Sequence, residues 1–345
     1  MVLSVRDGFS LPDNLPFLIT QGGKGTMFSY TIRRFLTLIP MLLIMTFLIF
    51  LGMELTPGDA VSFMAGPEAM ANISQAQLSA LRDSLGLNDP FIIRYFHWIG
   101  GVLHGDFGYS LTSGVPIKDI VLNRIPATLE LSLAALCIST LLGTILGLVS
   151  AVRKDRPIDR VFTVAGMVGV SIPEFFLGLV ALLVFAIDLG WLPIGGRLRP
   201  EYTVYWDHMK NLLLPALVLG VTMTAGVMRY TRSSMLDTIN KDYIKTARSK
   251  GLPEWRINLV HGFRVALTPV VVLIGFRLPM LIGGSVVIEQ IFQWPGVGNE
   301  FLGAVRSQNY PLVMMIALFS VFAVLIASFI IDLLTAALDP RVQLD

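Results

Sequence analysis

The chain has 345 residues and is 54% hydrophobic but 14% charged, with a net charge of +2 and a mean hydropathy of +0.70. Soluble domains carry about 25% charged residues, so this composition excludes an ordinary water-soluble protein and indicates one that needs lipid as its solvent. The single cysteine, Cys137, excludes a disulfide within the chain and is expected to serve packing inside an apolar segment.

The N-terminal region precedes the first apolar run of the chain. Its first 26 residues are rich in glycine and proline, and residues 1–29 are expected to form a cytoplasmic extension. The apolar run within 30–53 lacks the small-residue cleavage pattern of a secretory signal, which predicts a retained first transmembrane helix. Met27 directly precedes this run, so both Met1 and Met27 are candidate start residues.

Six apolar segments are long enough to cross a bilayer as helices, which takes about 20 residues each. The ionisable residues inside their apolar cores are Glu174 and Arg277. Backbone groups in lipid must be paired within each segment, and the alternating ten-residue pattern of a β-barrel is missing. The sequence therefore predicts an all-α polytopic membrane protein with six transmembrane helices at about 30–53, 127–152, 161–187, 211–228, 265–288 and 310–334.

Lysine and arginine are distributed unevenly over the loops between these segments. With the N-terminus in the cytoplasm, 17 of the 26 basic residues fall on cytoplasmic pieces and 8 on outside loops, while Arg277 lies inside a segment. Cytoplasmic loops carry the excess of Lys and Arg in membrane proteins. The distribution thus predicts cytoplasmic N- and C-termini.

A large extracytoplasmic loop is expected at 54–126. Helical spacing over Gln75–Leu85 predicts one short helix, and Phe91–Leu103 is rich in aromatic residues. That composition suits a helix lying at the membrane interface. A small soluble subdomain packed on the bundle is the alternative, and the sequence does not separate the two.

The cytoplasmic loop 229–264 is basic, with a net charge of +5, yet it is patterned like ordered structure. The apolar positions Leu236, Ile239, Tyr243 and Ala247 form one stripe on a helix expected over 234–250. Gly251 predicts the end of this helix, and a second helix is expected to begin at Pro253. The pattern predicts a helix, a glycine turn and a helix at the inner membrane surface.

Three interpretations of this loop compete. A strap held against anionic lipid explains the charge but not the two helices. Nucleic-acid binding is disfavoured because the basic residues have no companion fold and sit at the membrane. Docking of a cytoplasmic protein on a short ordered helix explains both features and is preferred.

The loop also resembles the EAA loop of ABC-importer permeases, with Gly251 matching the family's glycine. Its closest likeness is to the version found in dipeptide/oligopeptide permeases of the DppB/OppB type. The resemblance extends over about 310 residues. The segments that carry it, in order, are 33–34, 57–59, 86–90, 105–110, 128–131, 171–175, 242–252, 289–296 and 339–341.

The resemblance implies a type I ABC-importer permease fold, with a core domain over 127–345, in a bacterial or archaeal plasma (inner) membrane. It implies a heterodimer with a second, similar permease, two cytoplasmic ATPase subunits and an extracytoplasmic binding protein. This chain would then bind no cofactor, since the partner ATPases use ATP and magnesium. The residues expected to couple to an ATPase are Asp242, Tyr243, Thr246, Ala247, Lys250, Gly251 and Leu252.

The chain departs from the family pattern in the EAA triplet and at three single positions. Lys245-Thr246-Ala247 stands where the EAA consensus has Glu-Ala-Ala, which makes Ala247 the preferred contact. Val265, Arg277 and Asn309 replace residues that are common in the family, and these changes bear on the identity of the substrate.

Signals for chemistry are weak, and no metal site is expected. Residues 22–26 do not complete a phosphate-binding loop, because Leu18 stands where its first glycine is required. No histidine belongs to an H-E-x-x-H motif, and Cys137 has no nearby base in the sequence. An enzyme is therefore disfavoured, as is a secondary transporter, which would show more ionisable groups inside its spans.

Glu174 and Arg277 are the candidates for the translocation pathway. Arg277 is expected either to contact an anionic group of the substrate or to pair with Glu174 or with an acid of a partner chain. Peptides are the cargo that the resemblance implies, with oligosaccharides, nickel complexes and glutathione as alternatives.

Overall fold

The computed structural model describes residues 27–56, 74–84, 88–197, 205–282 and 286–338. Residues 1–26 of the expected N-terminal extension and the family segments at 57–59, 86–87 and 339–341 lie outside these residues, whereas 27–29 belong to the first helix. Within them the regular secondary structure is helical, apart from an isolated antiparallel bridge between Tyr109 and Pro116, and turns or loops connect the helices. The elements are α1 (Met27–Glu54), α3 (Gln75–Ser84), α4 (Phe91–Leu103), α5 (Ile117–Val152), α6 (Pro157–Ser171), α7 (Glu174–Ala181), η1 (Leu182–Asp188, π-helical), α8 (Tyr205–Ile239), α9 (Asp242–Ser249), α10 (Glu254–Arg256), η2 (Ile257–Phe263, π-helical), α11 (Arg264–Ile282), α12 (Val286–Ile291), α13 (Val297–Arg306) and α14 (Tyr310–Leu338).

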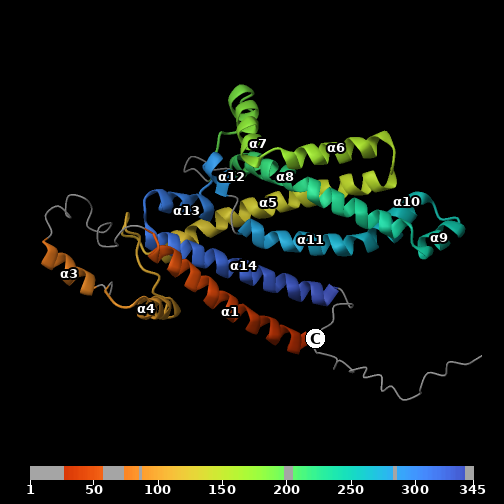
Figure 1. Cartoon of the computed structure of the whole chain (residues 1–345). Helices are drawn as coiled ribbons and strands as arrows, with labels where there is room; N and C mark the ends of the chain where they lie inside the picture. Colours follow the sequence, from red (N-terminus) through yellow and green to blue (C-terminus); the bar gives the residue numbers. More distant parts are fainter. Residues whose placement is uncertain (1–26, 57–73, 85–87, 198–204, 283–285, 339–345) are drawn as a thin grey trace, which may run out of the picture.

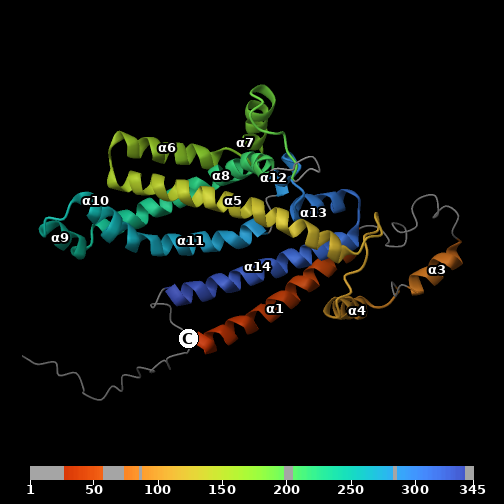
Figure 2. The same ribbon diagram turned by 180° about the vertical axis from the view of Figure 1, so that it is seen from behind.

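The long helices form one elongated bundle (Figure 1). Four of them, α1, α5, α8 and α14, are long and apolar enough to cross a membrane, and two bent helix pairs bring the number of candidate spans to six within the described residues. Both views place α3 and α4 at one end of the bundle and α9 and α10 at the other (Figure 2). We call these the α4 end and the α9 end.

The contact between α5 and α8 is the most extensive in the bundle. Three glycines allow it. A Cβ atom on Gly143 would lie 2.5 Å from the Val227 side chain, and one on Gly147 would lie 2.6 Å from the Met228 carbonyl oxygen. On the facing helix, a Cβ on Gly220 would lie 2.8 Å from Ile138. Small residues let helix backbones approach closely in membranes, where van der Waals contact drives association.

The segment predicted as one span over 161–187 is not a continuous helix. It consists of α6 followed by α7 and η1, which are bent by 98° relative to α6. Pro173 explains the break, because proline lacks a backbone N–H and pushes the preceding residue out of the helical region. Ile172 accordingly adopts extended backbone angles. The bend turns α7 across the bundle axis (Figure 1) and puts Glu174 at its first turn.

Helix α1 contacts α14 through an ion pair and α4 through aromatic packing. The Arg34 Nε donates to Asp332 Oδ2 at 2.6 Å, which joins α1 to α14. At the other end, the aromatic residues of α4 pack on Phe47 and Phe50 of α1. The opposite face of α4 leaves Phe96 exposed, as expected for a helix at the membrane interface.

Candidate functional site

The α9 end contains the predicted two-helix elbow, with one difference. The helix expected over 234–250 is broken: α8 ends at Ile239, and α9 begins at Asp242. Leu236 and Ile239 therefore belong to a different helix from Tyr243 and Ala247, so the four do not form one stripe. Gly251 ends the elbow's first arm with a φ of 76°, a left-handed conformation that glycine adopts without a steric penalty.

The inner face of α9 is anchored in a small apolar cluster. Ile244 and Ala247 are buried together with Ile257 of η2, and Leu252 packs against them. Ala247, predicted as the preferred outward contact, thus faces its own chain with 9% of its surface exposed. The cluster holds α9 against η2, which continues directly into α11. A displacement of α9 would therefore act on η2 and, through it, on the membrane-spanning helix α11.

The outer face of α9 carries the remaining candidate coupling residues. Tyr243 is 44% exposed, and Thr246 and Lys250 are exposed as well. Lys245 donates to Asp242 at 2.9 Å, and this bond holds the pKa of Asp242 below its ordinary value. Exposed ion pairs of this kind add little stability, so the face combines an aromatic ring with polar groups that are free to rearrange against a partner.

A salt bridge closes the elbow across its glycine turn. Arg248 Nε donates to Glu254 Oε1 at 2.5 Å, and Nη2 donates to Oε2 at 3.1 Å. The two residues lie on either side of Gly251, so the pair bridges α9 and α10 across the turn. Both views show α9 projecting at the tip of the bundle (Figures 1 and 2), where a partner can reach it.

Comparison with known proteins identifies the family. The model for "Binding-protein-dependent transport system inner membrane component" matches residues 143–344, and the model for the N-terminal part of such membrane components matches residues 27–133. The chain belongs to this family.

Individual relatives are similar over nearly their whole length. The oligopeptide transport system permease protein AppB of Bacillus subtilis is 41% identical over 320 residues, which are 92% of this chain and 100% of that protein. A putative peptide permease protein of Brucella suis is 39% identical, covering 92% of this chain and 99% of its own. The glutathione transport system permease protein GsiC of Salmonella choleraesuis is 38% identical with the same coverage.

The two ionisable residues expected in the permease's pathway are not paired with each other. Arg277 of α11 donates through Nη1 to the Met223 carbonyl oxygen of α8 at 3.0 Å. In the described part of the chain, no ion pair joins Arg277 to Glu174, so the expected pairing within this chain is wrong. Glu174 is half-buried at the start of α7.

A buried ion pair near the α9 end was missed in the sequence. Arg232 of α8 holds Asp159 of α6 through two hydrogen bonds of 2.8 Å each. The same carboxylate accepts from the Ser150 hydroxyl of α5 and from the Asp155 backbone N–H. A bidentate pair of this kind ties three helices together. Its members are 73 residues apart in the chain, so no local pattern could have revealed it.

The α4 end is held by a buried polar cluster around Glu289 of α12. This fully buried carboxylate accepts from the Thr128 hydroxyl and from the Asn299 backbone N–H, both at 2.8 Å. Trp294 is also fully buried and donates to the Ala127 carbonyl oxygen at 2.7 Å. The partners on α5, Thr128 and Ala127, are more than 160 residues away in the chain.

Asn309, one of the departures from the family pattern, has a structural place. Its side chain is buried, with Nδ2 donating to the Ser110 hydroxyl at 2.7 Å and Oδ1 accepting from the Leu111 N–H at 3.2 Å. It joins the loop before α5 to the start of α14. Cys137, expected to serve packing inside an apolar segment, lies on α5 and is exposed in this chain.

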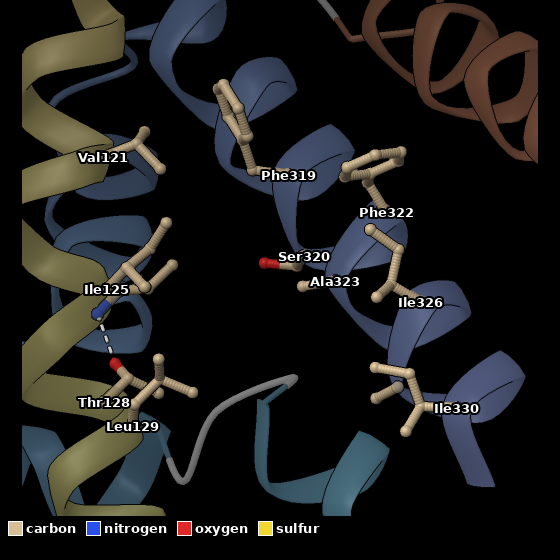
Figure 3. Close-up of a pocket in the computed structure, with 12 residues that line it drawn as sticks. Val121, Ile125, Thr128, Leu129, Phe319, Ser320, Phe322, Ala323, Ile326 and Ile330 are labelled. Atoms are coloured by element: carbon tan, nitrogen blue, oxygen red, sulfur yellow. Dashed lines mark hydrogen bonds between the residues drawn. The ribbon is translucent and has the colours of Figure 1, made fainter.

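An apolar cavity of about 420 Å³ lies between α5 and α14. Figure 3 shows Val121, Ile125 and Leu129 of α5 facing Phe319 and Ile326 of α14 across it. Thr128 borders the cavity, but its hydroxyl accepts from the Val297 N–H at 2.8 Å. The lining therefore offers shape and apolar surface rather than polar recognition.

Proposed function

We infer that this chain is the permease subunit of an ATP-driven importer and forms half of a translocation pathway for peptides. The observation that carries the inference is α9, a short helix anchored by a buried inner face and exposed on its outer face. Family membership and relatives named for oligopeptide, peptide and glutathione transport support it. Glutathione is itself a tripeptide, which favours peptides over the oligosaccharide and nickel alternatives.

The outer face of α9 is the proposed contact for an ATPase subunit. Tyr243, Thr246 and Lys250 supply the exposed surface, while Ala247 and Leu252 fix the helix from behind and Gly251 sets the turn. Helices that dock in a groove use such short ordered elements. Closure of the ATPases would move α9, and the packing of α9 on η2 would pass this movement to α11.

The remaining parts of the importer belong to other chains. Two cytoplasmic ATPase subunits would bind and hydrolyse ATP with magnesium, and this chain would bind no cofactor and catalyse no reaction. A second, homologous permease would complete the pathway as a heterodimer, and an extracytoplasmic binding protein would deliver the peptide. The proposed topology puts both termini and the α9 end in the cytoplasm, supported by the excess of basic residues there.

Glu174 and Arg277 are the residues proposed to line the pathway. Each is partly exposed in this chain although each belongs to a candidate span. Ionisable groups in membrane segments face a cavity or a partner rather than lipid, because lipid exposure of a charge is costly.

Transport itself is tested in proteoliposomes that contain the two permeases, the ATPases and the binding protein. We expect peptide uptake that requires ATP, magnesium and every subunit. Uptake driven by an ion gradient without the ATPases would refute the importer and support a secondary transporter. Identification of the ligand that co-purifies with the binding protein tests the cargo separately.

The coupling role of α9 is tested by combining Lys250→Glu with Gly251→Pro. Proline cannot adopt the positive φ of position 251, so the double variant changes both the outer face and the turn. We expect normal membrane insertion but loss of ATPase co-purification. Lys154→Glu, the same charge change on the exposed α5–α6 loop of the α9 end, is the matched control. Unchanged ATPase binding in the double variant would contradict the coupling role.

A further inference from the structure

Arg277 is seated on α8 in a way that leaves most of its guanidinium unused. One N–H donates to the Met223 carbonyl oxygen at 3.0 Å. A guanidinium has five N–H donors and no acceptor, and among the described residues no carboxylate receives the others. Arg277 therefore presents a positive charge and several donors at the depth of a membrane-spanning segment.

Gly226 allows the guanidinium to lie this close to α8. A Cβ atom at position 226 would lie 2.1 Å from Arg277 Nη2, so any larger residue would push the guanidinium off α8. Met223 and Gly226 are three residues apart and share one face of the helix. The guanidinium thus lies along that face, where Nη1 donates to the Met223 carbonyl oxygen and Nη2 lies over Gly226.

Arg229 continues the same face one turn nearer the α9 end. It follows Gly226, which lies directly under Arg277 Nη2, by three residues, and its side chain is exposed. No ion pair of Arg229 is found in the described part of the chain. Two neighbouring cations that repel each other and lack an acidic partner favour an anion between them.

We propose that Arg277 and Arg229 form an anion-binding site for the carboxylate of the cargo. The carboxylate would bind Arg277 first and then Arg229 as the cargo moves along α8 toward the α9 end. The inference rests on the proposed import of peptides, because a peptide brings a C-terminal carboxylate. Arg277, held flat by Met223 and Gly226, offers the planar fork that binds a carboxylate through two hydrogen bonds. Arg229 accepts the same group one helical turn further along.

The first experiment compares trialanine with trialanine amide in the complete reconstituted importer. We expect Arg277→Gln to lower uptake of the free acid by about tenfold or more relative to wild type, the loss of one charge-assisted carboxylate contact. Uptake of the amide should change by less than about twofold, because it lacks the carboxylate that the arginine recognises. Arg277→Lys, which keeps the charge but not the planar fork, should restore only part of the free-acid uptake.

Comparing each variant with wild type for the same peptide cancels any preference of the binding protein. An equal fall for both peptides, or no change for either, would overturn the anion site. If wild type carries neither peptide, the proposed cargo fails, and the following measurement still decides the anion site.

The second experiment measures the local charge without cargo, in the intact complex. Tyr230 is exposed and lies four residues from Gly226, on the same face. Tyr230→Cys in a Cys137→Ser background should react faster with an anionic than with a cationic methanethiosulfonate reagent. We expect Arg277→Gln or Arg229→Gln to lower this ratio severalfold. A ratio near one that neither substitution changes would mean that acids of the partner permease neutralise the arginines, and would refute the proposal.

Discussion

The Glu289 cluster at the α4 end and the elbow at the α9 end are held by different chemistry. At the α4 end, a buried carboxylate, Glu289, and a buried indole, Trp294, are satisfied by groups of α5. At the α9 end, the elbow is held by a cluster of three buried apolar residues, and its ion pairs are exposed. Buried hydrogen bonds tolerate little displacement because an unmade bond leaves a desolvated polar group. We therefore call the Glu289 cluster the fixed joint, and we call the elbow, with its exposed outer face, the arm.

The largest expected effect is at the fixed joint. Glu289→Ala removes the acceptor of the Thr128 hydroxyl and the Asn299 N–H and leaves a void, so we expect a loss of about 3 kcal/mol of stability. The measurement is the unfolding midpoint in detergent. Glu300→Ala, which breaks a partly exposed pair with Arg124 at the same end, should cost under about 1 kcal/mol. Equal costs would show that the Glu289 cluster is no stronger than a surface pair.

The next effect is at the apolar anchor of the arm. Ile257→Ala removes a fully buried side chain under α9, and we expect it to destabilise the local packing by about 2 kcal/mol. Hydrogen exchange of the α9 amides should quicken, while exchange at the α4 end stays unchanged. Leu259→Ala, the same kind of truncation at an exposed position of η2, serves as the control. Faster exchange at both ends would contradict the view that the arm and the fixed joint are stabilised independently.

The smallest effect is expected for the exposed pair that closes the elbow. Arg248 and Glu254 keep about half of their side-chain surface exposed, and such pairs contribute less than about 1 kcal/mol. A double-mutant cycle with Arg248→Gln and Glu254→Gln should give a coupling energy in that range. A coupling energy well above it would mean that the pair, rather than the apolar cluster, holds the elbow.

Much of the local structure could be predicted, because its signals are contained in short stretches. The helix expected over Phe91–Leu103 is α4 with the same limits, and Gly251 does end a helix, as its freedom at positive φ predicts. The bend at Pro173 was missed although proline was visible, since a strongly apolar run on both sides was interpreted as one span. Gly143 and Gly147 form a G-x-x-x-G pattern that could have predicted the close α5–α8 contact.

By itself the sequence determined the all-α membrane character, the position of the elbow and the likeness to peptide permeases, because these depend on composition, helix periodicity and local motifs. Only the tertiary structure decided which face of α9 is buried, which groups satisfy Glu289, and that Asp159 is held by Arg232. It also decided that Arg277 rests on α8 rather than on Glu174. Such contacts join residues tens to hundreds of positions apart, and helix rotation and packing, which no local pattern records, bring them together.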